Sequence, residues 1–129
     1  MSDVPPSHPR YASLKTREKV VEGVEGGITG LNGLIAQGRG EALDYLIGER
    51  TTAPGEEAER AAAAMLLLAE RPVLSVNGNA AALVPEEMVA LARKIDAPLE
   101  VNIFYRTEER VTKIANLLRS LGAGMVYGE

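Results

Sequence analysis

The spacing of apolar residues predicts helices in the first half of the chain. Apolar side chains recur at positions 11, 14, 21 and 24, which lie on one helical face, and the pattern stops at Gly26-Gly27. We therefore expect a helix from about residue 10 to residue 25. Its basic residues lie in the first half, where Arg10 and Arg17 are seven positions apart and share one face. That alignment allows both side chains to contact one anion.

Two shorter helices are expected next, separated by a glycine-rich turn. Thr29 is a suitable N-cap for a short helix that extends to about residue 36, although its glycines weaken it. After Gly38-Arg39-Gly40, a second helix is expected to run from about Gly40 to about Gly48. If Gly40 opens a helix, its backbone amides and the Arg39 guanidinium can hold an anion together. The alternative is an interhelical turn with a solvated arginine, and the spacing alone favours that alternative.

The segment 56–69 is the clearest helix in the sequence. It has acidic residues in its first turn and an alanine-rich body, and Pro72 stops it. Because its apolar positions are almost continuous around the helix, we expect it to be buried against a sheet or against a partner chain.

From Pro72 onward the pattern changes to strands that alternate with helices. The expected elements are strands at 73–76, at 99–105 and within 124–128, and helices at 85–95 and 107–121. This order indicates right-handed parallel crossovers, so the expected fold class is α/β: a doubly wound parallel sheet with flanking helices, preceded by an N-terminal helical segment. We expect a single domain over 1–129, mainly helical over 1–71 and built as a βαβαβ unit over 72–129.

Polar, glycine-containing segments follow the first two expected strands. Asn77-Gly78-Asn79 comes directly after Val76, and Tyr105-Arg106-Thr107 lies at the end of the second strand. In an open parallel sheet, ligands bind outside the carboxyl ends of the strands. Gly78 would let backbone amides approach a phosphate, the asparagines offer donors and acceptors, and Arg106 offers a planar fork of donors. The alternatives are a plain turn at the Asn-Gly-Asn segment and an ion pair between Arg106 and a nearby glutamate.

Composition and charge narrow the chemistry. The 129 residues carry a formal net charge of −4, which disfavours general nucleic-acid binding, yet the first 20 residues hold four basic against two acidic side chains. A basic island on an acidic protein suits a small anionic ligand. Cysteine is absent and His8 is the only histidine, so thiol chemistry is excluded, most transition-metal sites are disfavoured, and any metal is expected to be Mg²⁺ on oxygen ligands. No apolar run approaches the roughly 20 residues that span a bilayer, and the N-terminus lacks the apolar core of a signal peptide, so a cytoplasmic protein is expected.

Five segments of the sequence resemble one known family. They are SHPRY, TREKVVEG, GLIAQGRGEALDYLIGE, SVNGNAAALVPEE and EVNIFYRTEERV, in that order within the part of the chain from Ser7 to about Leu121. Together they are similar to the archaeal phosphopantothenate synthetases, also called 4-phosphopantoate–β-alanine ligases. The resemblance implies a Rossmann-like fold and a homodimer. It also implies an ATP-dependent condensation of 4-phosphopantoate with β-alanine through an acyl-adenylate, giving 4′-phosphopantothenate, AMP and pyrophosphate on the route to coenzyme A.

The resemblance also suggests roles for individual residues. Arg17 and Arg39 match the arginines that contact ATP, and Gly38 and Gly40 flank the second of them. The residues expected to bind phosphopantoate are Asn77, Gly78, Asn79, Tyr105, Arg106, Arg10 and His8. No catalytic side chain is assigned, because the main task of the catalyst is to neutralise and align the charged reactants, with Mg²⁺ accompanying the ATP.

Two departures from the family pattern leave an alternative open. Gln37 stands where family members usually have histidine, and glutamine cannot carry a proton charge. The family's chains are roughly twice this length, and their second half supplies much of the ATP pocket. The alternative is therefore a truncated, non-catalytic module of the same fold that binds an anion or dimerises. A nicotinamide-binding domain is disfavoured, because the segment from Asn77 to Ala82 lacks the Gly-x-Gly-x-x-Gly fingerprint.

Overall fold

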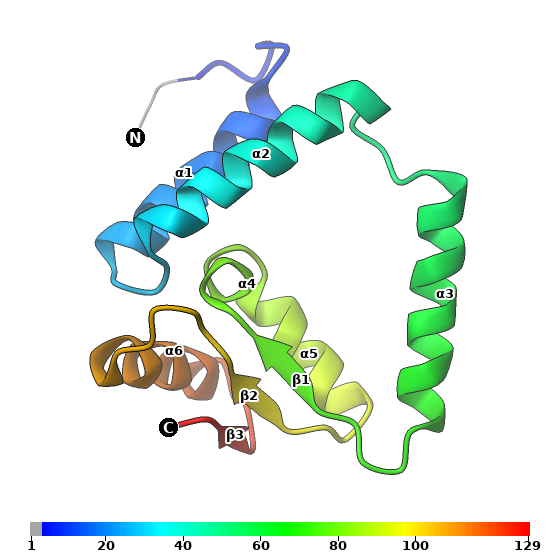
Figure 1. Cartoon of the computed structure of the whole chain (residues 1–129), viewed down its shortest axis with the longest axis vertical. Coiled ribbons are helices and arrows are strands. Elements are labelled where there is room, and N and C mark those ends of the chain that lie inside the picture. The colour runs from blue at the N-terminus through cyan, green and yellow to red at the C-terminus, as the bar shows by residue number, and fades with distance from the viewer. Residues whose placement is uncertain (1–3) are drawn as a thin grey trace.

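The computed structural model describes residues 4–129, and it combines a helical first half with a small α/β unit (Figure 1). In chain order the elements are α1 (Tyr11–Glu25), α2 (Leu31–Ile47), α3 (Ala53–Leu68), β1 (Leu74–Val76), α4 (Gly78–Leu83), α5 (Pro85–Lys94), β2 (Leu99–Val101), α6 (Glu108–Ser120) and β3 (Val126–Tyr127). The helices expected at 10–25, 85–95 and 107–121 are confirmed to within one residue at each end.

The three strands form one parallel sheet in the order β1-β2-β3. Leu74 pairs with Leu99, which pairs with Val126. Helix α5 contacts β1, α6 contacts β2 and β3, and the two helices contact each other, so both cover the same face. The α/β class is confirmed, but the doubly wound arrangement is wrong for the described residues, because two successive right-handed crossovers in one direction place their helices on one face. Ser75 and Tyr127 are exposed on the other face.

The hydrophobic core lies between the sheet and the helices α4, α5 and α6. Val76, Leu99 and Val101 enter it from the strands, and Ile114 and Leu118 enter it from α6; each is at most 2% exposed. Burying one such side chain contributes about 1.5–3 kcal/mol to stability. The core therefore fixes the carboxyl ends of β1 and β2 beside each other.

Helices α1 and α2 form an antiparallel pair that packs against α4 (Figure 1). Val20 and Gly23 are the buried residues of α1, and α2 has none. Helix α2 runs without a break through Gly38 and Gly40, so the helix start expected near Gly40 is wrong. A glycine inside a helix costs only about 1 kcal/mol relative to alanine, and the two glycines did not end the helix.

Helix α3 stands apart from the rest of the molecule (Figure 1). None of its residues is buried, and Met65 and Leu68 are 72% and 84% exposed, so the expected burial against a sheet is wrong within the described chain. Leu66 alone reaches the edge of the core. Between residues 4 and 129, no helix combines the length and the apolar content needed to cross a bilayer.

Two features at the carboxyl ends of the strands differ from expectation. Strand β2 ends at Val101 instead of reaching residue 105, and Tyr105 adopts a left-handed backbone with φ of 50° that an extended strand excludes. After β1, Asn77-Gly78-Asn79 does not form a plain turn but opens the short helix α4. Both changes bring more backbone and side-chain groups to this edge of the sheet.

Candidate functional site

A pocket of about 350 Å³ lies at the carboxyl ends of β1 and β2. Three segments wall it: the entry to α2, the start of α4 and the loop after β2. Its lining residues are Thr29, Gly30, Asn32, Gly33, Ala36, Asn77, Gly78, Asn79, Ile103, Phe104, Tyr105 and Arg110. The structure thus brings Asn77, Gly78, Asn79 and Tyr105 together, as the position of the strand ends predicted.

The start of α4 is shaped by Asn77 and Gly78. The Asn77 side chain accepts a hydrogen bond from the Ala80 amide at 2.9 Å and caps the helix. Gly78 lies against the segment before α2, because a Cβ at this position would sit 2.9 Å from the Ile28 carbonyl oxygen and 3.0 Å from the Thr29 Cα. A glycine is therefore needed for the two backbones to come this close, and the Asn77 carboxamide is used to cap a helix.

Asn79 ties α4 to the first turn of α2. Its carboxamide nitrogen donates to the Gly33 carbonyl at 2.9 Å, and its oxygen accepts from the Thr29 hydroxyl at 2.7 Å. Gly33 has no room for a side chain here, since a Cβ would lie 2.3 Å from both the Asn79 and the Thr29 oxygen. Asn79 thus fixes the pocket wall.

The charged side chains that line this pocket are positive only. None of its lining residues is an aspartate or a glutamate, and Arg110 is the one cationic residue among them. Gly30, the N-cap of α2, provides no side chain to cap the first amides of that helix. Helix N-termini carry a partial positive charge and free N–H groups. The arrangement suits a small ligand with an anionic group.

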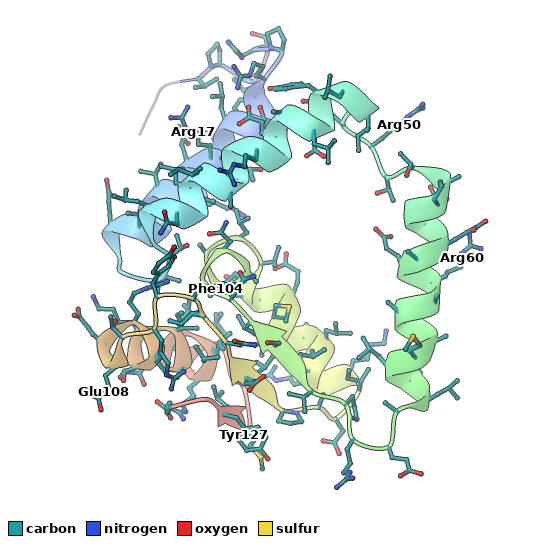
Figure 2. The ribbon with its side chains drawn as sticks, viewed as in Figure 1. Arg17, Arg50, Arg60, Phe104, Glu108 and Tyr127 are labelled. Carbon is teal, nitrogen blue, oxygen red and sulfur yellow. The ribbon has the colours of Figure 1, made fainter. Side chains whose placement is uncertain are left out.

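The loop after β2 is open to solvent. Phe104 and Tyr105 are 90% and 75% exposed, and Figure 2 shows Phe104 on this loop, on the side where α1 and α2 meet. Arg106 does not line the pocket; its Nη2 donates to the Gly128 carbonyl beyond β3. The predicted ion pair of Arg106 with a glutamate is not found among residues 4–129.

His8 and Arg10, two residues expected to bind phosphopantoate, lie at the N-terminal end of α1. Arg10 donates to the Glu41 carboxylate and the Tyr45 hydroxyl, and its hydrogen bond is the main cause of a lowered pKa at Glu41. The same pair raises the pKa of Arg10. The His8 Nδ1 accepts from the Arg10 amide at 3.0 Å. Arg10 and His8 therefore make contacts within the protein, away from the pocket at the strand ends.

Three of the four residues expected to bind ATP, Gly38, Arg39 and Gly40, are consecutive in α2, and the fourth, Arg17, lies on α1. Gly40 and Gln37 line a shallow hollow of about 330 Å³ between α1 and α2, whose walls also carry Glu41, Asp44 and Glu49. Arg17 and Arg39 are exposed, and Figure 2 shows Arg17 pointing away from the sheet. Gly38 and Gly40 lie inside α2, where the amides follow the helix. Three carboxylates disfavour a triphosphate in this hollow.

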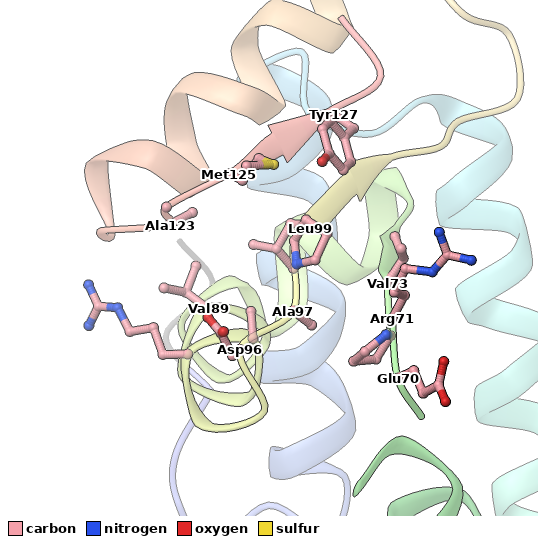
Figure 3. Close-up of a pocket in the computed structure, with 15 residues that line it drawn as sticks. Glu70, Arg71, Val73, Val89, Asp96, Ala97, Leu99, Ala123, Met125 and Tyr127 are labelled. Atoms are coloured by element: carbon pink, nitrogen blue, oxygen red, sulfur yellow. The ribbon is translucent and has the colours of Figure 1, made fainter. Parts of the chain in front are cut away.

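Another hollow, of about 580 Å³, lies at the opposite edge of the sheet (Figure 3). Val89, Ala97 and Leu99 give it an apolar interior, while Arg71 and Asp96 bring opposite charges to its walls. It lies where the parallel strands begin, and ligands of such sheets bind where strands end. Within residues 4–129, no group of three or more histidine, aspartate or glutamate side chains is placed to hold a metal ion.

Sequence reasoning missed several lining residues of the pocket. Thr29 was expected only as a helix cap, and Arg110 resembled an ordinary charge on the surface of a helix. Asn32 and Phe104 carried no signal beyond their nearness to the expected strand and helix ends. The one available signal for Arg110 was its position in the first turn of a helix that follows a strand end, where a parallel sheet places its ligand.

Known proteins similar to this chain were also identified. The family described as phosphopantothenate/pantothenate synthetase matches residues 54–129. A curated 4-phosphopantoate–β-alanine ligase from Thermococcus onnurineus is 65% identical over 119 residues, which are 92% of this chain and 46% of that protein. The ligase of the same name from Methanosarcina mazei is 58% identical over 129 residues, which are 100% of this chain and 51% of that protein. The chain spans about half the length of the curated relatives it matches.

Proposed function

Because the chain belongs to the phosphopantothenate/pantothenate synthetase family, we propose that it acts in the ATP-dependent condensation of 4-phosphopantoate with β-alanine. Its relatives carry the name of that ligase. Within this reaction we assign the chain the binding of 4-phosphopantoate, in the pocket at the ends of β1 and β2. The products are 4′-phosphopantothenate, AMP and pyrophosphate, on the route to coenzyme A.

The absence of carboxylates from the pocket walls carries the proposal. The ligand 4-phosphopantoate bears a phosphate and a carboxylate, and each would be repelled by a nearby acid. The described pocket presents Arg110, the amides at the start of α2 and the neutral side chain of Asn32. Its volume of about 350 Å³ is at the lower end of the range of small-molecule sites. A small polyanion of this kind fits both the charge and the size.

ATP binding is a further part of the proposal. The matching arginines Arg17 and Arg39 are the residues of this chain that would contact the nucleotide, and both are exposed and accessible. Mg²⁺ would be held by the nucleotide phosphates and would neutralise their charge. The carboxylate of phosphopantoate and the triphosphate repel each other; the positive charge of Arg110 beside the pocket would offset part of that repulsion, and the pocket walls add no negative charge to it.

A second candidate is a module that binds the acid substrate without turning it over. It is favoured by the hollow beside Gly40, whose walls carry three carboxylates that oppose a triphosphate there. Incubation of the purified chain with ATP, Mg²⁺, 4-phosphopantoate and β-alanine separates the two candidates. AMP release that requires all the substrates supports the ligase, whereas binding of phosphopantoate without AMP release supports the module.

Calorimetric titration with 4-phosphopantoate tests the binding site itself. We expect Asn32→Asp to abolish binding, because it places a carboxylate in the pocket wall. Asn116→Asp makes the same charge change on the exposed surface of α6 and should leave the affinity unchanged. Binding that is equally strong in all three proteins would place the ligand elsewhere, and no binding by the wild-type chain would remove 4-phosphopantoate as its ligand.

We further propose that two copies of the chain associate through α3. This helix is about 24 Å long at 1.5 Å per residue, and its second half, residues 61–68, is apolar on all sides, with Leu67 and Leu68 71% and 84% exposed. Helix α2 also exposes Leu43 and Leu46. Stable interfaces bury about 800 Å² on each partner, and large exposed apolar patches mark such interfaces. Sedimentation analysis should show a dimer that Leu68→Glu dissociates and that Phe104→Glu, an equally polar change elsewhere, preserves.

A further inference from the structure

Arg110 connects two segments that are far apart in the sequence. From the first turn of α6, its Nη1 donates to the carbonyls of Phe104 and Tyr105 at 3.3 and 3.0 Å. Its Nη2 donates at 3.3 Å to the carbonyl of Ile28, 82 residues away. Ile28 directly precedes the pocket wall formed by Thr29 and Gly30. One guanidinium therefore holds the two loops that face each other across the pocket.

Side-chain packing does not hold the loop after β2. Phe104 and Tyr105 are mostly exposed, and Tyr105 has φ of 50°. A left-handed backbone at a residue with a Cβ costs about 1–2 kcal/mol, and it persists only where the surroundings determine it. The two hydrogen bonds from Arg110 are made to the carbonyls on either side of the Tyr105 Cα. They are the contacts that hold this conformation.

The guanidinium of Arg110 is directed by carbonyl groups alone. Arg110 makes no ion pair with any residue between 4 and 129, and its Nε is buried without a hydrogen-bond partner. An unpaired buried donor is unfavourable by about 1–3 kcal/mol, so the side chain would leave this place without its three carbonyl bonds. Its positive charge stays beside a pocket without acidic residues.

We propose that Arg110 is a positioning residue, whose guanidinium fixes residues 28–30 and 103–105 against each other and keeps the pocket in the shape that admits an anionic ligand. The nature of the ligand rests on the proposed function, whereas the fixing of the loops does not. A lysine would keep the charge but could not form the planar fork that reaches three carbonyls. Arg110→Lys therefore separates the effect of the hydrogen-bond geometry from the effect of the positive charge.

Hydrogen exchange of the full chain without ligand tests the positioning role. In Arg110→Lys and Arg110→Gln, the amides of residues 28–33 and 102–106 should exchange about tenfold faster, while those of β1 and β2 keep wild-type protection. Arg119→Gln removes the same charge from the same helix, at an ion pair with Glu129, and should leave both loops unchanged. Unchanged loop exchange in both Arg110 variants overturns the proposal. So does a loss of protection that is uniform over the chain, or a failure of both variants to fold.

Titration with 4-phosphopantoate then tests whether the positions of the two loops affect the affinity for the ligand. If the wild-type chain binds it, Arg110→Lys should bind at least about tenfold more weakly at equal charge, and Arg119→Gln should bind normally. Wild-type affinity in Arg110→Lys would overturn the link between loop geometry and binding. If the wild-type chain binds no phosphopantoate, the proposed substrate fails, and the exchange experiment still decides whether Arg110 positions the loops.

Discussion

The two halves of the chain treat their apolar residues in opposite ways. In the βαβαβ unit, Ile114 and Leu118 are completely buried in a core that the sheet and its helices share. In the helical half, α2 and α3 have no buried residue, and Leu46 and Leu68 are 85% and 84% exposed. The first half is therefore not stabilised by a core of its own, and its apolar surfaces are available for association.

The two halves also differ in how the N-termini of their helices are capped. Asn77 and Thr107 cap α4 and α6 with side-chain hydrogen bonds, whereas α1, α2 and α3 have no such cap. A good cap contributes about 1 kcal/mol to a helix. Two of the three helices in the unit that contains the core thus have a side-chain cap, and none in the helical half has one, so the two halves should respond unequally to the same kind of substitution.

The largest expected difference comes from matched leucine truncations. Leu118→Ala removes a fully buried side chain and should lower the free energy of unfolding by about 2–5 kcal/mol. Leu67→Ala, on exposed α3, should change it by less than about 0.5 kcal/mol at concentrations where the chain is monomeric. Urea denaturation followed by circular dichroism measures both. Equal losses would mean that α3 is packed within the monomer.

The contact between the halves is tested by two glycines of the same helix. Gly33→Ala places a Cβ against the hydrogen-bonded oxygens of Thr29 and Asn79 and should destabilise the protein by about 1–3 kcal/mol. Gly38→Ala has no atom within 4 Å of the new Cβ and should stabilise it by up to about 1 kcal/mol. Thermal unfolding distinguishes the opposite signs. Stabilisation by both would show that the Thr29–Asn79 contact is absent in solution.

A smaller effect is expected from the capping residues. Thr107→Ala removes the acceptor of the Arg110 amide and should cost about 1 kcal/mol of stability. Thr52→Ala removes the same hydroxyl from the N-cap position of α3, where it makes no capping hydrogen bond, and should have almost no effect. Chemical denaturation of the two variants under one set of conditions provides the comparison. A loss at position 52 as large as at 107 would contradict it.

The smallest effect concerns the Arg10–Glu41 pair within the helical half. Hydrogen bonding to Arg10 lowers the pKa of Glu41, so the pair stabilises the fold above the ordinary glutamate pKa of about 4.3 and loses that contribution as pH falls through the lowered pKa. Glu41→Gln should therefore unfold at a lower temperature than wild type at pH 7. The gap in melting temperature should close toward pH 3 and should be absent at both pH values in Glu57→Gln, a matched change on α3.

Elements bounded by clear signals could be predicted from the sequence. Pro85 and Gly122 mark the limits of α5 and α6, and Gly26-Gly27 marks the end of α1, so these helices were placed to within a residue. The site was predicted as far as its edge of the sheet, because parallel strands bring Asn77-Gly78-Asn79 and Tyr105 to one side.

The rest depended on tertiary contacts that the sequence does not display. Gly38 and Gly40 were expected to separate two helices, but α2 continues through both. A Cβ at either position would have no neighbouring atom within 4 Å. For Asn77 the sequence predicted ligand contact and left a plain turn as the alternative; its use as a helix cap was not foreseen, because the same residue types favour turns and helix caps. Arg110 could not be distinguished from a solvated charge, because its partners are backbone carbonyls that belong to loops distant in sequence.

The hydrogen bond between Thr29 and Asn79 joins residues 50 positions apart, whereas Leu74 and Leu99 pair across half that distance. Closing a longer loop costs more chain entropy, and contacts between distant residues slow folding. We therefore expect the βαβαβ unit to assemble first and the α1–α2 pair to dock onto α4 afterwards. In that order of events the pocket is the last part of the molecule to form, and the earliest to open when the chain unfolds.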